Sequence, residues 1–193
     1  MAASIPTAAL PLAGRRVFLT GGAKGIGAAI ARRLSADGAH VVLADRDIAA
    51  AQALAEKIGA HAVELDVTEL ERTRQVVLDT GPHHILVNNA GMDQHVYFTR
   101  TEIADWRRLL AVNLEAGFAP TPAPLPAMQA AGFGRLINIA SEAGRMGSRG
   151  AAVYAAAKGG VIAFTRSIAR ENGHKGITAK VIAPAPIDTP LLR

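Results

Sequence analysis

Cysteine is missing from the 193-residue chain, and aromatic residues make up only 4% of it. Without thiols the protein cannot form disulfides, thiolate metal sites or a cysteine nucleophile. Half of the residues are nevertheless hydrophobic, which argues against a disordered chain, and the length suits one domain with a substantial core. We expect a single domain over residues 1–193, with a flexible leader at 1–14 and closely packed, alanine-rich helices on a sheet.

Clustered positive charge and uninterrupted apolar segments are also missing. The net charge is +5, but no run of five or more lysines and arginines occurs, which argues against a nucleic-acid-binding protein. One long uncharged stretch, residues 116–134, contains four prolines and so does not read as a membrane helix. The first fourteen residues lack the basic and apolar regions of a secretory signal. We therefore predict a cytoplasmic protein that binds neither nucleic acid nor membrane.

Short apolar runs alternate with segments of helical periodicity along the chain. This alternation predicts an α/β fold with a doubly wound parallel sheet and helices on both of its faces. The expected strands are residues 16–20, 40–45, 62–66, 84–88, 135–140 and 177–182. The carboxyl ends of parallel strands meet at one edge of the sheet, where ligands bind. Polar motifs that follow the strands are therefore expected to lie together.

Capping residues mark the starts and ends of the expected helices. Asp47 and Gly59 should bound the second helix at its amino and carboxyl ends, and the last helix should end by Gly173. Two Thr/Glu pairs have the spacing of capping boxes and predict two further helix starts. These pairs are Thr68 with Glu71 and Thr99 with Glu102.

A glycine-rich loop, TGGAKGIG, lies between the first expected strand and the first helix. Its glycines permit a tight turn close to a pyrophosphate, and the helix that follows offers amide groups and a positive dipole end. Such a loop is weak support for nucleotide binding when taken alone. The candidate cofactor-binding residues in it are Gly21, Lys24, Gly25, Ile26 and Gly27.

Asp45 ends the second expected strand, 18 residues after Gly27. An acid there can accept hydrogen bonds from a ribose 2′-hydroxyl, and its charge would repel a 2′-phosphate, which favours NAD over NADP. Lys24 and Arg46 favour the opposite preference, because cations can approach that phosphate. The alternative is that Asp45 is simply an aspartate in a strand-to-helix turn.

Two further motifs follow strands. Asp66 and Val67 could reach an adenine edge, or Asp66 could merely cap the next helix. Asn88 to Gly91 form the string NNAG, in which Asn89, Ala90 and Gly91 are candidate cofactor contacts. Its small residues allow the backbone to approach a cofactor and its amides can bridge strands, although NNAG alone is also an ordinary turn.

Tyr154 and Lys158 stand four residues apart in an expected helix, so they share one face. A phenol is a weak base near neutral pH, and a nearby cation would lower its pKa. Such a pair can move a proton to or from a hydroxyl. Ser141 closes the fifth strand and could donate to a substrate carbonyl, or could cap a turn. Asn113 is unfavourable within a helix and needs a reason, such as a kink or a bound water.

The ordered set of motifs resembles the classical short-chain dehydrogenases/reductases from about Arg15 to Arg193. The matching strings include TGGAKGIG, LDV at 65–67, NNAG, the Tyr154/Lys158 pair and IAPAPIDTP at 182–190. The resemblance implies a Rossmann-type fold, a nicotinamide cofactor and reversible hydride transfer between a secondary alcohol and a ketone. It implies that Tyr154 is the general acid/base, that Lys158 holds the ribose hydroxyls and lowers the Tyr154 pKa, and that Ser141 orients the substrate oxygen. It also implies that Asn113 holds a water in a proton relay, and that Ile187 and Thr189 contact the nicotinamide end.

Three departures from the family pattern bear on activity. Ala185 stands where the family usually has glycine, and could strain its loop. Prolines at 120, 122 and 124 should break or reroute the helix after Asn113, which often forms the subunit interface, so a homo-oligomer is possible but its interface is expected to be disrupted. The chain ends at Arg193, without the final strand and substrate-covering segment of related proteins, which would leave the sixth strand at a sheet edge.

Two functions therefore remain open at the level of sequence. The first is an NAD-dependent oxidoreductase acting on a small alcohol or ketone, and the second is a catalytically impaired relative that retains dinucleotide binding. No metal site is expected, because His83, His84 and His95 read as solvated loop residues. The substrate cannot be read, since its determinants lie in variable segments such as residues 92–100.

Overall fold

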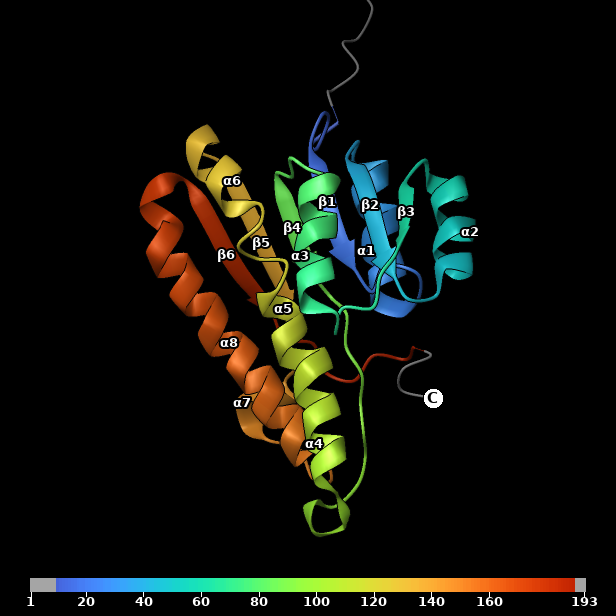
Figure 1. Cartoon of the computed structure of the whole chain (residues 1–193), viewed down its shortest axis with the longest axis vertical. Coiled ribbons are helices and arrows are strands. Elements are labelled where there is room, and N and C mark those ends of the chain that lie inside the picture. Colours follow the sequence, from blue (N-terminus) through green and yellow to red (C-terminus); the bar gives the residue numbers. More distant parts are fainter. Residues whose placement is uncertain (1–9, 190–193) are drawn as a thin grey trace, which may run out of the picture.

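The computed structural model describes residues 10–189, which form a six-stranded sheet with helices on both faces (Figure 1). All neighbouring strands are parallel, in the order β3-β2-β1-β4-β5-β6. The strands are β1 (Arg16–Thr20), β2 (His40–Asp45), β3 (His61–Glu64), β4 (Ile85–Asn88), β5 (Gly134–Ile139) and β6 (Ile177–Ile182). The predicted doubly wound parallel sheet is confirmed, and β6 forms one of its edges. Only β3, β4 and β5 differ from the predicted bounds, by one or two residues.

The helices connect the strands in the expected alternation. They are α1 (Gly25–Ala36), α2 (Ile48–Ile58), α3 (Leu70–Asp79), α4 (Ile103–Leu110), α5 (Ala116–Phe118), α6 (Leu125–Ala131), α7 (Ala143–Met146) and α8 (Ala152–Asn172). Three shorter helical segments are the 3₁₀ turns η1 (Phe98–Arg100) and η3 (Gly173–Lys175) and the π-helical segment η2 (Ala111–Glu115). Figure 1 shows α8 lying along β6 and continuing beyond the strands beside α4. Within residues 10–189, no helix has both the length and the apolar character needed to cross a membrane.

Alternate side chains of the central strands enter two hydrophobic cores. On one face, Phe18, Leu86 and Leu136 pack with residues of α3, α5, α6 and α8. On the other face, Val17 and Leu43 pack with residues of α1 and α2. Burial on both faces accounts for the continuous apolar runs of these strands, as expected for a parallel sheet covered by helices.

Helix caps were predicted with mixed success. Asp47 does cap α2 by accepting a hydrogen bond from the Ala50 amide, and Gly59 ends the helix with φ of 67°. The predicted Thr68/Glu71 box is wrong, because the Thr68 hydroxyl donates to the Asp66 carboxylate at 2.7 Å and the helix begins only after Glu69. The Thr99/Glu102 box is also wrong, since Thr99 lies in η1 and the box that forms pairs Glu102 with Asp105.

Prolines interrupt the helix that follows Asn113, as predicted. The chain passes from η2 through α5 into a turn at residues 119–124 before α6 begins. Pro122 has no N–H to donate to the Phe118 carbonyl, and the Thr121 amide donates to it instead at 3.1 Å. The Thr121 hydroxyl donates to the Gly117 carbonyl at 2.8 Å. These local bonds satisfy carbonyls that would otherwise lack partners in the broken helix.

Part of the predicted flexible leader is held against the sheet. The Leu12 amide donates to the Asp37 carbonyl at 2.8 Å, and a Cβ added at Gly38 would lie 2.9 Å from Leu10 Cβ. Residues 10–14 therefore contact the turn between α1 and β2, and the flexibility of the leader stays a prediction. The remainder of the predicted leader, residues 1–9, lies outside the described residues, as do residues 190–193.

Candidate active site

The glycine loop between β1 and α1 packs directly against the NNAG turn. Gly21 has φ of 63°, and a Cβ at this position would lie 2.8 Å from the Ala90 Cα. A Cβ at Gly27 would overlap the Gly21 carbonyl oxygen. Larger residues would thus force apart the first turn of α1 and the end of β1, which matches the tight turn predicted for this loop.

Asn89 holds the glycine loop in place. Its side-chain Nδ2 donates to the Thr20 and Gly21 carbonyls at 3.2 and 2.8 Å. The Thr20 hydroxyl oxygen in turn accepts hydrogen bonds from the Asn89 and Ala90 amides at 3.1 and 3.2 Å. The amides of NNAG therefore do bridge strands, as predicted, and they bring its backbone against the loop that follows β1.

The start of α1 has the properties of an anion site. The helix lacks a side-chain cap and has no acidic residue in its first turn. Amide groups at such a terminus, together with the helix dipole, favour a phosphate. The residues present therefore fit the pyrophosphate of a dinucleotide.

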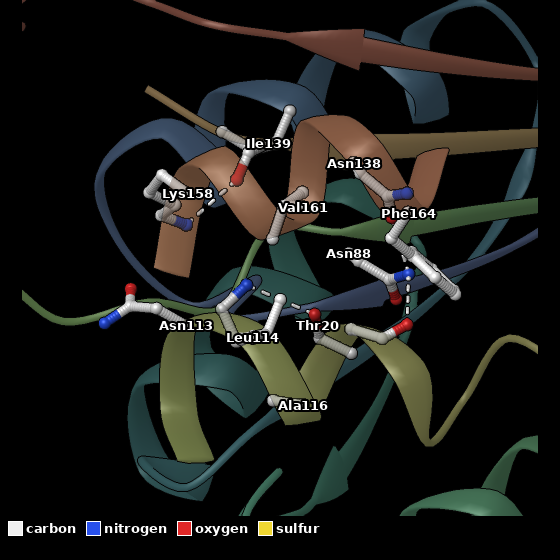
Figure 2. A pocket seen from close by; sticks show the side chains of 12 residues that line it. Thr20, Asn88, Asn113, Leu114, Ala116, Asn138, Ile139, Lys158, Val161 and Phe164 are labelled. Atoms are coloured by element: carbon white, nitrogen blue, oxygen red, sulfur yellow. Dashed lines mark hydrogen bonds between the residues drawn. The ribbon is translucent and has the colours of Figure 1, made fainter. Parts of the chain in front are cut away.

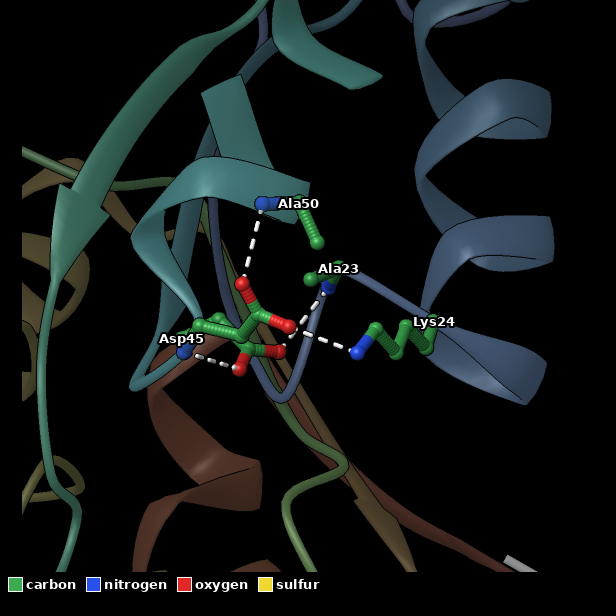
Figure 3. A network of polar contacts seen from close by, with 5 residues as sticks. Ala23, Lys24, Asp45 and Ala50 are labelled. Carbon is green, nitrogen blue, oxygen red and sulfur yellow. Dashed lines mark hydrogen bonds and ion pairs between the residues drawn. The ribbon is translucent and has the colours of Figure 1, made fainter. Parts of the chain in front are cut away.

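Asp45 lies at the carboxyl end of β2, beside this loop (Figure 3). Its Oδ2 accepts a hydrogen bond from the Ala23 amide and its Oδ1 one from the Asp47 amide, both at 3.0 Å. The exposed Lys24 ammonium pairs with Asp47 Oδ2 at 2.6 Å. This pairing raises the pKa of Lys24 and lowers that of Asp47. Asp45 is consequently a fixed acid at the end of β2, whereas Lys24, one of the two cations considered above, is paired with another carboxylate.

The LDV motif has a structural use in this chain. Asp66 Oδ1 accepts hydrogen bonds from the Thr68 amide and hydroxyl at 2.9 and 2.7 Å, and these bonds lower the pKa of Asp66. The Val67 side chain is buried in the core. Asp66 thus stabilises the turn before α3, but it does not cap that helix as predicted, because the N-cap residue is Glu69. An adenine contact at Asp66 stays a prediction.

Tyr154 and Lys158 occupy the first two turns of α8. The Lys158 side chain is buried, with 4% of the residue exposed, and its Nζ donates to the Ile139 carbonyl at 2.9 Å (Figure 2). The same Nζ lies 5.8 Å from the centre of the Tyr154 ring. The helix therefore places the ammonium against the end of β5 and next to the phenol, as the four-residue spacing predicts.

Asn113 lies in the π-helical segment η2, where the helix widens by a residue. Its Nδ2 donates to the Met92 and Leu109 carbonyls at 2.9 and 3.1 Å, and its Oδ1 accepts from the Met92 amide at 3.1 Å. The predicted need for a kink is thus met, and such bulges are common at functional sites. A Cβ added at Gly91 would lie 3.1 Å from Asn113 Oδ1 and 3.4 Å from Lys158 Nζ. Gly91 therefore lets both groups approach one point.

Ser141 follows β5, two residues after the carbonyl that binds Lys158. Its hydroxyl oxygen accepts a hydrogen bond from the Ala143 amide at 3.2 Å, at the start of α7. Burial raises the pKa of Tyr154, and a hydrogen bond with the Ser141 side chain opposes that rise. Ser141 thus caps a turn, which is the simpler predicted reading, and it also faces the phenol, while its donation to a substrate carbonyl stays a prediction.

The balance of charges at Tyr154 corrects one prediction. We expected Lys158 to lower the pKa of the phenol, but burial raises it above 10.0, and the negative charge of Asp93 adds to that effect. Burial also lowers the pKa of Lys158 to about 8. Desolvation is thus the largest cause of the shift in both pKa values.

A small cavity lies next to Lys158 and Asn113 (Figure 2). The volume of the cavity is about 10 Å³, which is roughly what one water molecule needs. Residues from β1, β4, β5, η2, α5 and α8 line it, among them Thr20, Asn88, Asn113, Asn138 and Lys158. The cavity shows that Lys158 and Asn113 border the same space.

Residues 15–193 match the family model described as short chain dehydrogenase. The chain belongs to this family. It is 38% identical over 186 residues to the 3-oxoacyl-[acyl-carrier-protein] reductase FabG of Escherichia coli. This alignment covers 93% of the chain and 76% of the relative. It is also 38% identical over 187 residues to the reductase MabA of Mycobacterium tuberculosis, with 95% and 73% covered. The two expectations of family and Rossmann-type fold are therefore confirmed.

A solved short-chain dehydrogenase has the same architecture. It is a candidate NAD(P) dependent gluconate 5-dehydrogenase from Beutenbergia cavernae, with a TM-score of 0.88 and 34% sequence identity. The match covers 95% of this chain and 76% of that one, and the solved structure holds NADP at low occupancy. The chain therefore belongs to a family of oxidoreductases that use a nucleotide cofactor.

The tail of this short-chain dehydrogenase is less strained than the sequence indicated. No non-glycine residue among 10–189 has a positive φ, so Ala185 adopts an ordinary backbone conformation and the expected strain is absent. The Glu142 amide donates to the Pro184 carbonyl at 3.0 Å and anchors the tail beside Ser141. Ile187 is 46% exposed and Thr189 is half-buried, so their predicted contacts with a nicotinamide remain to be tested.

The histidines of this dehydrogenase were only partly predicted. His83 is buried against the Phe18 ring, and burial lowers its pKa to about 4, so the solvated reading is wrong for this residue. His84 Nδ1 accepts from the Arg16 amide, and the exposed His95 lies 3.0 Å from Asp93. Over residues 10–189, no group of three or more histidines and acids could hold a metal ion.

Sequence reasoning missed several residues that shape the site. Thr20 supports the NNAG turn, Asn138 and Thr165 form buried hydrogen bonds near Lys158, and Asp93 acts on Tyr154. An asparagine inside the apolar run RLINIA was the available signal for Asn138, because a buried amide requires partners. Asp93 gave no such signal, since its position depends on how the loop after Gly91 folds.

Proposed function

We propose that this protein is a nicotinamide-dependent oxidoreductase that interconverts a secondary alcohol and a ketone, with Tyr154 as the general acid/base. The supporting observation is the gathering of Tyr154, Lys158, Ser141 and Asn113 at the carboxyl edge of the sheet, beside the glycine loop. A phenol, an ammonium and a hydroxyl in that arrangement suit proton transfer at a carbinol oxygen.

Each residue has a proposed task in that reaction. The dinucleotide, when bound, supplies or accepts the hydride. Ser141 orients the substrate oxygen, Tyr154 exchanges a proton with it, and Lys158 holds the ribose hydroxyls. Asn113 fixes the loop at Met92 next to Lys158 and supports the path of the proton. Because burial raises the pKa of Tyr154, the phenol is protonated at neutral pH and is ready to donate during ketone reduction.

The dinucleotide would lie along the edge formed by the glycine loop and the NNAG turn. The α1 terminus would bind the pyrophosphate, and Asn89, Ala90 and Gly91 would line the path to Lys158. Asp66 and Val67 would lie at the adenine, and Ile187 and Thr189 at the nicotinamide. The family's usual hydride chemistry would then take place next to Tyr154.

We further propose that NAD is preferred over NADP. Asp45 is held at the end of β2 by two amides, and the charge of Lys24 is neutralised by Asp47. A fixed carboxylate would bind the ribose 2′-hydroxyl and repel a 2′-phosphate. The solved relative that holds NADP favours the opposite preference, so both nucleotides must be compared.

Fluorescence titration with NADH and NADPH tests the cofactor proposal. We expect tighter binding of NADH, and a shift of at least about tenfold toward NADPH in Asp45→Asn, because a like-charge contact is removed. Asp79→Asn, at the end of α3, is a control that changes net charge equally and should keep the wild-type ratio. Equal preference in wild type and Asp45→Asn would refute the role of Asp45.

Turnover of a panel of secondary alcohols and ketones tests the reaction. The relatives named above justify including 3-oxoacyl thioesters and gluconate. Tyr154→Phe should lower kcat by at least about a hundredfold and spare dinucleotide affinity, because only proton transfer is lost. Tyr97→Phe changes the other tyrosine of the chain and should leave kcat unchanged. Equal activity in Tyr154→Phe and wild type would remove Tyr154 from its proposed role.

A second function is favoured by the electrostatics of the site. The pKa of Tyr154 is raised and that of Lys158 lowered, which is opposite to the activation expected of this pair. These directions fit a relative that binds dinucleotide but is impaired in alcohol oxidation, because a protonated phenol cannot accept a proton. Dinucleotide binding with no turnover of any panel member would establish this alternative. The expected disruption of a subunit interface by the prolines stays a prediction, which a measurement of molecular mass in solution would test.

A further inference from the structure

A chain of buried side-chain hydrogen bonds runs from the sheet to α8, close to Lys158. Asn88 Nδ2 donates to Asn138 Oδ1 at 2.8 Å, between residues that are direct partners of β4 and β5. Asn138 Nδ2 donates to the Thr165 hydroxyl at 2.8 Å, and that hydroxyl donates to the Val161 carbonyl. Asn138 and Thr165 are 3% and 2% exposed. The chain thus joins two strands to one helix without access to solvent.

Thr165 and Lys158 lie on the same face of α8. The buried positions of this helix include Lys158, Val161, Ile162 and Thr165, which follow the i, i+3, i+4, i+7 pattern. Thr165 is therefore two turns beyond Lys158, about 10 Å along the axis. Its partner Asn138 and the partner of Lys158, the Ile139 carbonyl, are consecutive residues of β5. The Asn138–Thr165 and Lys158–Ile139 hydrogen bonds consequently join this face of α8 to the carboxyl end of β5.

The packing around these contacts does not fix α8 by shape alone. Val161 and Ile162 form a small core cluster with Ala140, together with Leu114, Val181 and Ala183. Such apolar contacts are non-directional, whereas a buried hydrogen bond between amide and hydroxyl is lost after a shift of less than an ångström. An amide left unpaired at this depth would be costly. Besides the bond of Lys158 itself, the Asn138–Thr165 bond is therefore a directional contact that specifies how α8 sits on β5.

We propose that Asn138 and Thr165 are positioning residues that hold α8 on β5 in the arrangement that brings the Lys158 ammonium to the Ile139 carbonyl. Neither residue would touch substrate or dinucleotide. The catalytic consequence of this placement rests on the proposed function, whereas the placement of Lys158 itself can be measured without turnover. Asn88 supports the arrangement by fixing which end of the Asn138 amide faces the helix.

Thr165→Val tests the proposal, because valine keeps the shape of threonine but cannot pair with Asn138. Thr165→Ser keeps the hydroxyl and is the rescue variant. Thr73→Val is the matched control, since Thr73 is also fully buried in a helix but its hydroxyl has no hydrogen-bond partner among the described residues. Thr165→Ala, which leaves room for a water at Asn138, replaces the valine variant if that variant does not fold.

Lysine ¹⁵N NMR provides the direct measurement. The chain has five lysines, and the Lys158 signal is identified by its loss in Lys158→Met. We expect Thr165→Val to move the titration midpoint of the Lys158 ammonium by about half a pH unit or more, and Thr165→Ser and Thr73→Val to keep the wild-type midpoint. In turnover, kcat/KM should fall by about tenfold or more in Thr165→Val only, with its pH profile displaced in the same direction.

The outcomes separate the two proposals. A Thr165→Val protein that is less stable but keeps the wild-type Lys158 midpoint and kcat/KM would overturn the positioning role, because the bond would then be merely structural. A moved midpoint that serine restores supports it, even if no panel substrate is turned over by wild type. Absence of turnover in wild type alone would count against the proposed function and leave the NMR result to decide the placement of Lys158.

Discussion

Replacing Lys158 with methionine is expected to make the folded protein more stable at neutral pH. The ammonium is buried, and burial lowers its pKa from 10.5 to about 8. Methionine has a similar length and no charge. The variant therefore removes the free-energy cost of keeping a proton on a desolvated amine, while it removes the group proposed to hold the dinucleotide.

The magnitude follows from the two pKa values. Below pH 8 the lysine is protonated in both states, and the folded state carries the full cost of about 3 kcal/mol. Between pH 8 and 10.5 the folded protein releases the proton while the unfolded chain keeps it, so wild-type stability rises with pH. At pH 10 the remaining cost is roughly 1 kcal/mol. Loss of the bond to the Ile139 carbonyl offsets about 1.5 kcal/mol of the gain at every pH.

Urea unfolding followed by circular dichroism at pH 7, 8, 9 and 10 measures this effect. The stability advantage of Lys158→Met over wild type should fall by about 2.5 kcal/mol from pH 7 to pH 10. Lys57→Met removes an exposed lysine of α2 and should give a difference that does not change with pH. A Lys158→Met advantage that stays constant to within about 0.5 kcal/mol would show that the ammonium is not desolvated, and would refute the reasoning.

Two further results are expected from the same structure. Gly27→Ala should destabilise the protein and abolish dinucleotide binding, because a Cβ would overlap the Gly21 carbonyl oxygen. The control variant Gly173→Ala should be tolerated, since a Cβ there meets nothing within 4 Å. Thermal unfolding and NADH titration measure both effects, and a Gly27→Ala protein that binds NADH normally would contradict the prediction. The raised pKa of Tyr154 predicts that alcohol oxidation, which needs the phenolate, keeps accelerating as the pH rises through the alkaline range, while ketone reduction, which needs the protonated phenol, stays level there. pH profiles of kcat/KM in both directions test this, and an oxidation profile that levels off near neutral pH would show an activated phenol instead.

Local sequence signals were sufficient wherever one element defined the feature. The glycine loop, Asp47 and Gly59 are cases in which the required backbone conformation or cap depends on residues within one turn. The four-residue spacing of Tyr154 and Lys158 likewise fixed their common face. Strand ends were predicted to gather at one edge because parallel topology leaves no alternative.

The wrong predictions share a dependence on competing or distant partners. Thr68 was available as a cap in the sequence, but its amide and hydroxyl both bind the Asp66 carboxylate in a turn, and the helix begins only after Glu69. The direction in which the pKa of Tyr154 shifts depends on how deeply its side chain is buried, and the spacing of residues in the sequence does not indicate that depth. Asn138 and Thr165 are 27 residues apart, so their pairing becomes visible only once α8 is placed on the sheet.

The turn at residues 119–124 has a consequence for how water reaches the interior. It replaces regular helical hydrogen bonds with a few local ones from Thr121, so its amide protons should exchange with deuterium faster than those of α8. Ala116 and Gly117, just before this turn, line the cavity that Lys158 also lines. Transient opening of the turn would therefore hydrate the ammonium from the side of the cavity, and would raise the pKa of Lys158 toward its ordinary value without any movement at the glycine loop.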